Sequence, residues 1–302
     1  MNFDIFKEYE PLYIIGHKKP DVDSVISTII LSKIFKNNNI KCYPCFLNKG
    51  YEIDEYNTKI LNDCVDLNMH IIDNDDDSLN YVLVDHNDPT QSIGFGKRVV
   101  WGIDHHKNSK ILSNILLDNT CSCALNIYNF FKDKYKFSNE EKFLIAMASL
   151  ADSLFFKGSR YSERDKKLFS ELGYDLDSNR LFKKYFIPTD LSLGIEHLFN
   201  NITKTYNYKG VKFDSLVIKT YNEYEYLKQD FINEIKNKNN FLGVWIDFNK
   251  EMSYAYFKYN ANFKEFIYDF LASRAATVIP DVFKYIDACL ENNIKNNSEQ
   301  YF

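Results

Sequence analysis

Four short segments of the chain concentrate the residue types that bind divalent metal ions. They are Gly16–Asp23, Asp85–Asp88, Asp104–His106 and Asp152–Ser153. Four of the six histidines in the chain lie inside them. Imidazole nitrogens and carboxylate oxygens together suit borderline divalent ions such as Mn²⁺, Co²⁺, Fe²⁺ or Zn²⁺. The four segments therefore predict a dinuclear metal centre.

Three of these segments directly follow short apolar runs that predict β-strands. Leu12–Ile15 precedes the first segment, Tyr81–Val84 the second and Arg98–Ile103 the third. Open α/β sheets bind their ligands at the carboxyl ends of strands, so we expect the polar side chains to meet there. Asp152 lies late in a predicted helix, 139–155, and would approach from the side.

The candidate ligands suffice for two metals if one carboxylate bridges them. Pro20 fixes the turn that fans the first three ligands around the crevice. The six are His17, Asp21, Asp23, Asp85, His105 and Asp152. Taken alone, Asp21 and Asp23 also suit a helix N-terminus, where the dipole favours carboxylates, and His86 alone suits a buried structural role. The joint pattern is what favours the metal centre.

Strands and helices alternate in the first part of the chain. Apolar residues at helical spacing predict a helix over 23–35, and 41–46 predicts a further strand. Helices are expected at 121–133 and 139–155, the second with a capping box formed by Ser138 and Glu141. Such alternation predicts right-handed crossovers and a mostly parallel sheet.

The pattern changes near Ile187–Asp190, where Pro188 stops a helix. The expected elements beyond it are helices at 191–202, 224–237, 263–272 and 279–290 and strands at 211–220, 241–248 and 253–259. This order is α+β rather than alternating. We therefore expect a parallel α/β domain over 1–187 and a smaller α+β domain over 188–302.

The composition narrows the functional classes. The 302 residues are 45% hydrophobic and carry a net charge of −5, without the basic stripe of a nucleic-acid groove. No apolar stretch reaches 18 residues, and the amino terminus does not predict a signal peptide. We expect a cytoplasmic protein whose six cysteines are reduced, with no nucleic-acid or membrane partner.

At these motifs the chain resembles the DHH phosphoesterase family, in particular the family II (manganese-dependent) inorganic pyrophosphatases. Asp104-His105-His106 is the motif that names the family. The other matching segments, in chain order, are Gly16–Ser24, Leu83–Asp88, Ala151–Lys157, Ser273-Arg274 and Val278–Pro280. The resemblance thus spans nearly the whole chain. It implies that 1–187 is a metal-binding DHH domain and 188–302 a substrate-binding domain, with the active site in the cleft between them.

The resemblance also implies how the ligands divide. One ion would be held by His17, Asp21 and Asp85, and the other by Asp23, His105, Asp152 and the shared Asp85. His106 would face substrate. The resemblance implies two divalent ions, preferably Mn²⁺ or Co²⁺, and an additional Mg²⁺ that binds together with the substrate. A water between the ions becomes a hydroxide that attacks phosphorus in pyrophosphate.

The phosphate side of the site is implied to come from the second domain. Lys204 and Arg274 are the matching residues, and an arginine can grip a phosphate bidentately. With Asp85 and His106 they complete the implied catalytic set. The chain departs from the family at Ala275-Ala276, where two lysines are usual, and at Lys19, where asparagine is usual. Either two lysines have been replaced deliberately, or this is a natural relative with weakened or altered activity.

Two other functions fit the same motifs. One is a short-chain exopolyphosphatase, because a relative in the superfamily uses the same metal cluster. The other is a catalytically impaired phosphate-binding or regulatory relative, since Ala275 removes a positive charge from the phosphate side. Dimers that pair through the amino-terminal domain are common in the family, which makes a homodimer one expected assembly.

Overall fold

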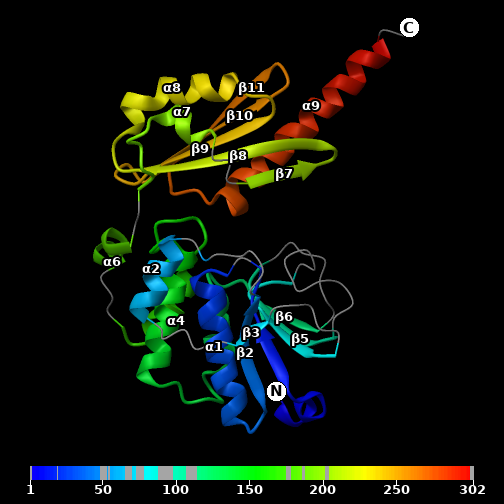
Figure 1. Ribbon diagram of the computed structural model, residues 1–302, viewed down its shortest axis with the longest axis vertical. Coiled ribbons are helices and arrows are strands. Elements are labelled where there is room, and N and C mark those ends of the chain that lie inside the picture. Colours follow the sequence, from blue (N-terminus) through cyan, green and yellow to red (C-terminus); the bar gives the residue numbers. More distant parts are fainter. Residues whose placement is uncertain are drawn as a thin grey trace. The chain divides into compact units, whose positions relative to one another are not determined.

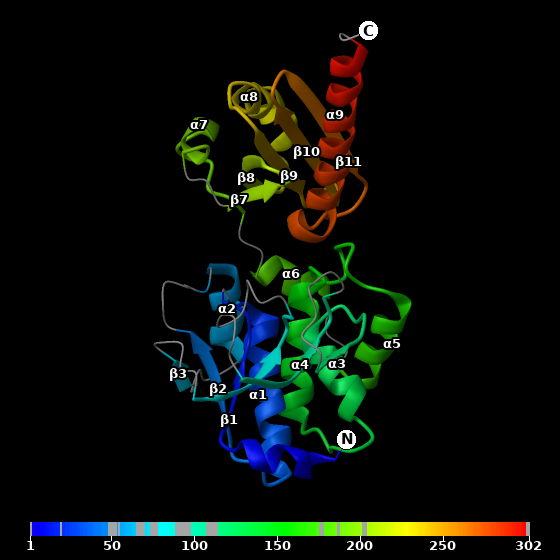
Figure 2. The same ribbon diagram turned by 90° about the vertical axis from the view of Figure 1, so that its right-hand side faces the viewer.

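The chain folds into two compact units. The computed structural model describes residues 2–18, 20–47, 53, 55–64, 70–72, 78–87, 98–106, 114–174, 178–185, 188–200 and 204–299. The amino-terminal unit comprises Met1–Phe156 and Tyr161–Phe186, and the carboxy-terminal unit comprises Lys157–Arg160 and Ile187–Phe302 (Figures 1 and 2). The short segment Lys157–Arg160 thus clusters with the second unit although it lies far upstream of Pro188.

The amino-terminal unit is built on a six-stranded parallel sheet in the order β3-β2-β1-β4-β5-β6. The strands are β1 (Leu12–Ile15), β2 (Cys42–Leu47), β3 (His70–Ile72), β4 (Asn80–Val84), β5 (Arg98–Asp104) and β6 (Ile115–Leu117). The predicted parallel α/β architecture is confirmed. The strand order reverses between β1 and β4, and such a switch point is where open α/β sheets bind ligands.

Helices and a short 3₁₀ segment pack around this sheet. They are η1 (Phe3–Tyr9), α1 (Val22–Asn37), α2 (Glu55–Cys64), α3 (Cys123–Phe131), α4 (Asn139–Asp152), α5 (Glu163–Glu171) and α6 (Ser178–Tyr185). Helix α1 packs against both α3 and α4, which explains why it is buried on nearly every side. Among the helices of the described residues, none combines the length and the hydrophobicity that a membrane span needs.

The start of α4 follows the sequence prediction, whereas its end does not. The Ser138 hydroxyl accepts from the Glu141 amide at 3.1 Å, and the Glu141 carboxylate accepts from the Ser138 amide at 2.8 Å, so the capping box is confirmed. The helix ends at Asp152 rather than at 155. Leu154, Phe155 and Phe156 take left-handed φ angles of 52°, 56° and 59°, a conformation that ends a right-handed helix.

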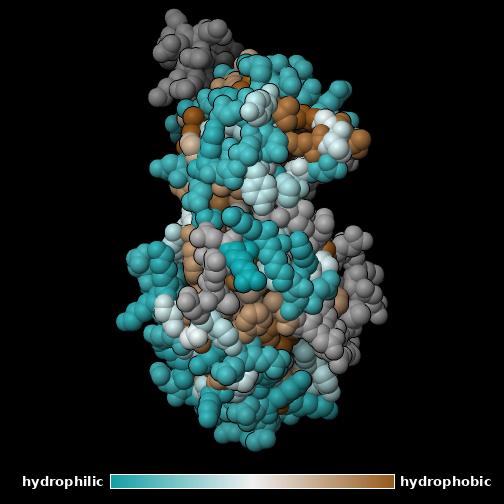
Figure 3. Space-filling view, turned by 90° about the vertical axis from the view of Figure 1, so that its left-hand side faces the viewer, coloured by the Kyte–Doolittle hydropathy of each residue, from teal (hydrophilic) through white to brown (hydrophobic). Residues whose placement is uncertain are grey.

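The carboxy-terminal unit has a five-stranded mixed sheet in the order β11-β10-β9-β8-β7. Strands β8 and β9 are parallel, and the other neighbours are antiparallel. Its elements are α7 (Ile195–Leu198), β7 (Lys204–Tyr208), β8 (Val211–Thr220), α8 (Tyr224–Lys236), β9 (Phe241–Asp247), β10 (Met252–Tyr259), β11 (Asn262–Tyr268), η3 (Arg274–Val278, a π-helix) and α9 (Ile279–Glu299). Helix α8 packs on β9 and β10 over buried Trp245 and Phe231. Hydrophilic residues cover most of the face in Figure 3, in keeping with apolar cores inside the units.

Two helix predictions in this unit are wrong. Residues 262–268 form strand β11, because the turn after Tyr259 returns the chain to pair with β10, with Ile267 opposite Tyr254. Asn260 takes the left-handed φ of 52° that this turn needs. Phe263, Phe266 and Ile267 have helical spacing, so the local pattern could not reveal the pairing. The helix expected at 191–202 is only the single turn α7.

The close packing of α8 on β9 leads to a stability prediction. A methyl group on Gly243 of β9 would lie 2.3 Å from Ile235 Cδ1 and 2.7 Å from Phe231 Cζ. We expect Gly243→Ala to lower the free energy of unfolding by about 1–3 kcal/mol through overpacking. Urea denaturation measures this. The loss should shrink in a Phe231→Leu background, and an equal loss in both backgrounds would contradict the packing explanation.

Candidate metal centre

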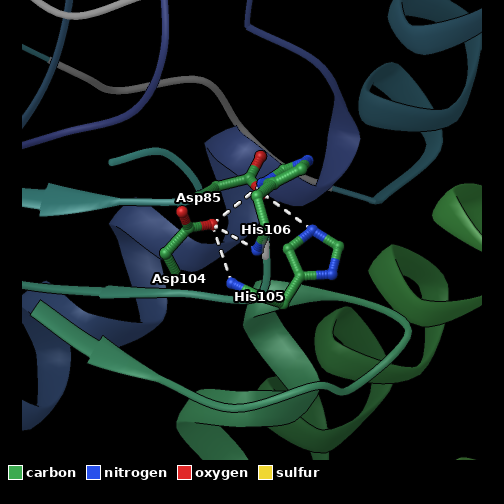
Figure 4. Close-up of side chains that lie close together, drawn as sticks. All are labelled: Asp85, Asp104, His105 and His106. Atoms are coloured by element: carbon green, nitrogen blue, oxygen red, sulfur yellow. Dashed lines mark hydrogen bonds and ion pairs between the residues drawn. The ribbon is translucent and has the colours of Figure 1, made fainter. Parts of the chain in front are cut away.

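The ends of three neighbouring strands bring the candidate ligands together. His17 follows β1, Asp85 follows β4 directly, and Asp104 is the last residue of β5 and precedes His105 and His106. Because β1, β4 and β5 are adjacent and parallel, their carboxyl ends lie side by side. Figure 4 shows Asp85, His105 and His106 converging in front of Asp104.

Asp85 lies at the middle of this arrangement. Its side chain is only 2% exposed, and its Oδ2 lies 3.3 Å from His17 Nε2 while its Oδ1 lies 3.2 Å from His105 Nε2. Its backbone has a left-handed φ of 60°, which is costly for a residue other than glycine, and its amide donates to the Ile103 carbonyl at 3.1 Å. This conformation turns the chain at the strand end and aims one carboxylate oxygen at each imidazole.

One group of ligand atoms forms around His17. Its Nε2 lies 3.5 Å from Asp21 Oδ2 as well as near Asp85, and one ligand atom from each of the three residues falls within a 4.8 Å span. Asp21 is the N-cap of α1, because its Oδ1 accepts from the Ser24 amide at 2.9 Å. The first turn of α1 therefore holds Asp21 Oδ1, while Asp21 Oδ2 faces His17.

A second group forms around His105. Its Nε2 lies 3.7 Å from both Asp23 Oδ2 and Asp152 Oδ2. On the other side of the ring, Nδ1 lies 2.9 Å from the Thr120 carbonyl, which accepts the Nδ1 hydrogen. Nε2 is therefore the nitrogen that faces the carboxylates, and it lies 3.2 Å from Asp85 Oδ1. Once Nε2 has lost its proton, its lone pair fits a cation.

The amino terminus of α3 holds Asp23 in place. The Cys123 amide donates to Asp23 Oδ2 at 2.6 Å, the Ala124 amide to Oδ1 at 2.9 Å, and the Ser27 hydroxyl to Oδ1 at 3.3 Å. Sequence reasoning missed this contact, because Asp23 and Cys123 are 100 residues apart. Ser122, which caps α3 through the Leu125 amide, was the available signal that a helix starts there.

The protonation states follow from burial and neighbouring charges. Burial alone would lower the pKa of His17, but the hydrogen bonds of Asp21 and Asp85 raise it to about 11. In the same way Asp85 and its neighbours outweigh burial and raise the pKa of His105 to about 10. Burial, then the nearby Asp85, raises the pKa of Asp23, whereas bonds from both histidines hold the pKa of Asp85 low despite its burial. The protein therefore retains protons where a cation would bind.

Asp104 and His106 form a third group with Asp85 and His105, whose ligand atoms also lie within 4.8 Å of one another. Asp104 is fully buried, and its Oδ1 accepts from the His105 amide at 2.7 Å, the His106 amide at 3.2 Å and His106 Nδ1 at 2.9 Å. Its Oδ2 accepts from Asn87 Nδ2 at 2.6 Å. The His106 side chain is 39% exposed, so this ring lies at the rim of the cluster.

In the carboxy-terminal unit, the Arg274 side chain and the Lys204 backbone each lie next to Ser215. Arg274 begins η3, and its Nη1 lies 3.3 Å from Ser215 Oγ of β8. Burial raises the pKa of Tyr206, against the effect of the nearby Arg274 charge. Lys204 stands opposite Ser215 in the β7–β8 ladder. Lys19 and the side chains of Lys204, Ala275 and Ala276 lie outside the described residues.

One protein family matches the amino-terminal part of the chain. The model of the DHH family, N-terminal domain, matches residues 11–154, which include the ligand groups around His17 and His105.

Several relatives of this chain carry the same name. A Bacillus licheniformis protein named "Probable manganese-dependent inorganic pyrophosphatase" is 30% identical over 176 residues, 55% of this chain. The match spans 56% of that relative, little more than half its length. A Clostridium acetobutylicum protein of the same name is 24% identical over 249 residues, 77% of this chain and 79% of the relative.

A solved structure shares the fold across both units. A crystal structure of a "Methanococcus jannaschii putative family II inorganic pyrophosphatase" aligns with a TM-score of 0.68 and 20% identity. The alignment covers 90% of this chain and 98% of that one. The parallel-sheet unit and the mixed-sheet unit after it therefore have a fold that is already known.

The raised histidine pKa values lead to a prediction about metal uptake. Ions bind neutral imidazoles, so Mn²⁺ binding below pH 10 should release the protons of His17 and His105, and affinity should rise about tenfold per pH unit for each proton displaced. Calorimetry in buffers of different ionisation enthalpy counts these protons, and a count of zero would contradict the assignment.

Without metal, both histidines stabilise the fold fully below their ordinary pKa of 6.5, and this contribution to the free energy of unfolding is lost as pH rises through about 10 to 11.

The geometry of Asp85 leads to a second prediction. Asp85→Asn should weaken Mn²⁺ binding in both groups at once, because each Asp85 oxygen faces a different histidine. Calorimetric titration should show fewer bound ions and a lower affinity for any that remain. Asp118→Asn is the control: this carboxylate pairs with Arg164 outside the cluster and should leave binding unchanged. Wild-type Mn²⁺ binding by Asp85→Asn would overturn the shared-ligand assignment.

Proposed function

We propose that this protein is a metal-dependent hydrolase that cleaves inorganic pyrophosphate into two phosphates. The observation that carries the proposal is the Asp85 carboxylate, which has one oxygen at 3.3 Å from His17 Nε2 and the other at 3.2 Å from His105 Nε2. A carboxylate shared between two sets of ligands is what a pair of divalent ions requires. The names of the relatives support pyrophosphate as the substrate.

The six proposed ligands fit two divalent ions. His17, Asp21 and Asp85 would hold one, and Asp23, His105 and Asp152, with Asp85 again, the other. Carboxylate oxygens together with two imidazole nitrogens form a donor set suited to Mn²⁺ or Co²⁺. When bound, such a pair would activate water and neutralise charge on the transferred phosphoryl group. A further Mg²⁺ would arrive with the substrate.

The protein residues orient these groups before substrate arrives. The Thr120 carbonyl fixes the His105 tautomer, and the α3 amides fix Asp23, so both ligands are aimed without a metal. Ligands held by such outer contacts lose little conformational entropy on binding. His106, held by Asp104, would contact a phosphate oxygen of the substrate.

The carboxy-terminal unit would bind the phosphate that leaves. Phosphoryl transfer depends on positioning and on positive charge near the departing oxygens. Arg274, whose Nη1 donates to the Ser215 hydroxyl at 3.3 Å, would supply this charge. Lys204, opposite Ser215 in the sheet, would supply a second cation.

The decisive experiment is phosphate release from pyrophosphate by Mn²⁺-loaded protein. We expect Ala275→Lys to raise kcat/KM by about tenfold or more, because a charge next to Arg274 would be added where the transition state accumulates negative charge. Ala276→Lys is the neighbouring control. If neither the wild type nor Ala275→Lys releases phosphate, the assignment is wrong.

Tripolyphosphate and tetrapolyphosphate serve as competing substrates in the same assay. Faster release from these chains than from pyrophosphate would instead identify a short-chain exopolyphosphatase. Tight pyrophosphate binding without turnover in both proteins would identify a phosphate-binding relative.

A further inference from the structure

His106 is fixed by a carboxylate that nothing else in the proposed reaction uses. Asp104 Oδ1 lies 2.9 Å from His106 Nδ1 and also accepts the backbone amide of His106 at 3.2 Å. Because an ionised carboxylate can only accept, Nδ1 carries the hydrogen of this bond. The contact therefore selects one tautomer and leaves Nε2 as the nitrogen for a ligand (Figure 4).

Asn87 holds this pair together through one amide group. Its Nδ2 donates to Asp104 Oδ2 at 2.6 Å and to the His106 carbonyl at 3.0 Å. One hydrogen thus fixes the carboxylate that orients the ring, and the other fixes the backbone that carries it. Asn87 is 1% exposed, so no solvent competes for these bonds.

Stability alone does not explain why asparagine occupies this position. Its Oδ1 is buried and has no hydrogen-bond partner in the part of the chain that the structure describes. A buried acceptor without a partner destabilises the folded protein. Asn87 donates both of its amide hydrogens to the Asp104–His106 pair even though its own acceptor is left without a partner, and this combination suits a positioning role.

We propose that Asn87 is a positioning residue that holds Asp104, and through it His106, with Nε2 facing the substrate, where the imidazolium form of the ring would donate its Nε2 hydrogen to a phosphate oxygen. The role of His106 toward substrate rests on the proposed function. The orientation of the ring rests on the contacts of Asn87 and Asp104 alone.

The chain offers a matched control in Asn126. It is also an asparagine of 1% exposure, and its Nδ2 also donates to Asp104, but to the backbone carbonyl, at 2.9 Å. Asn126→Ala therefore removes a buried amide bond to the same residue without touching the carboxylate. A general loss of packing would affect both variants, whereas positioning would affect only Asn87→Ala.

The tautomer can be measured directly. ¹⁵N-labelled protein loaded with diamagnetic Mg²⁺ and studied by NMR at alkaline pH should show His106 as one tautomer, with hydrogen on Nδ1; a His106→Gln variant assigns the signals. We expect Asn126→Ala to keep this tautomer and Asn87→Ala to show a mixture of two. Asn87→Ser replaces Asn87→Ala if the alanine variant does not fold. An unchanged tautomer in the Asn87 variant, or an equal mixture in Asn126→Ala, overturns the proposal.

Kinetics supply the second measurement. Asn87→Ala should lower kcat for pyrophosphate by about 10–100-fold, as removal of an outer hydrogen-bonding partner commonly does, with unchanged Mn²⁺ affinity by calorimetry. An unchanged kcat, or a loss matched by Asn126→Ala, overturns the positioning role. If the wild type releases no phosphate, the proposed function fails, while the tautomer measurement still decides whether Asn87 positions His106.

Discussion

The burial of several carboxylates within a few ångströms of one another is the constraint on which the amino-terminal unit depends. Asp23 and Asp85 are each about 2% exposed, and both face His105. Like charges at such distances in a dry site are unfavourable unless cations or protons compensate them. Without metal, the raised pKa values of two histidines and of Asp23 provide that compensation.

The surrounding fold provides the groups that keep this arrangement in place. Two helix starts contribute, since α1 holds Asp21 through the Ser24 amide and α3 holds Asp23 through two further amides. The left-handed turn at Asp85 adds backbone strain, which the parallel pairing of β4 and β5 balances. The cluster is thus assembled from secondary-structure ends, where backbone donors are unused by the helices themselves.

The carboxy-terminal unit is built around an aromatic core instead of a cluster of buried charges. Its mixed sheet buries an aromatic core around Trp245, Phe231 and Tyr256, and η3 follows this sheet with Arg274 near Ser215. A π-helix is rare and often marks a functional position, which agrees with the placement of Arg274 at its first residue. The basic residues proposed to bind phosphate thus belong to the strands and the π-helix of the carboxy-terminal unit.

The sequence by itself determined the candidate ligand types, the strands they follow, the parallel architecture and the capping box of α4. These features could be predicted because they depend on apolar spacing and on residues a few positions apart. Only the tertiary structure decided that β1, β4 and β5 are neighbours, that α3 holds Asp23, that Asn87 lies behind His106, and that 262–268 is a strand. Each of these depends on contacts between residues far apart in the chain or on a hairpin return, and helical or strand periodicity carries no information about such contacts.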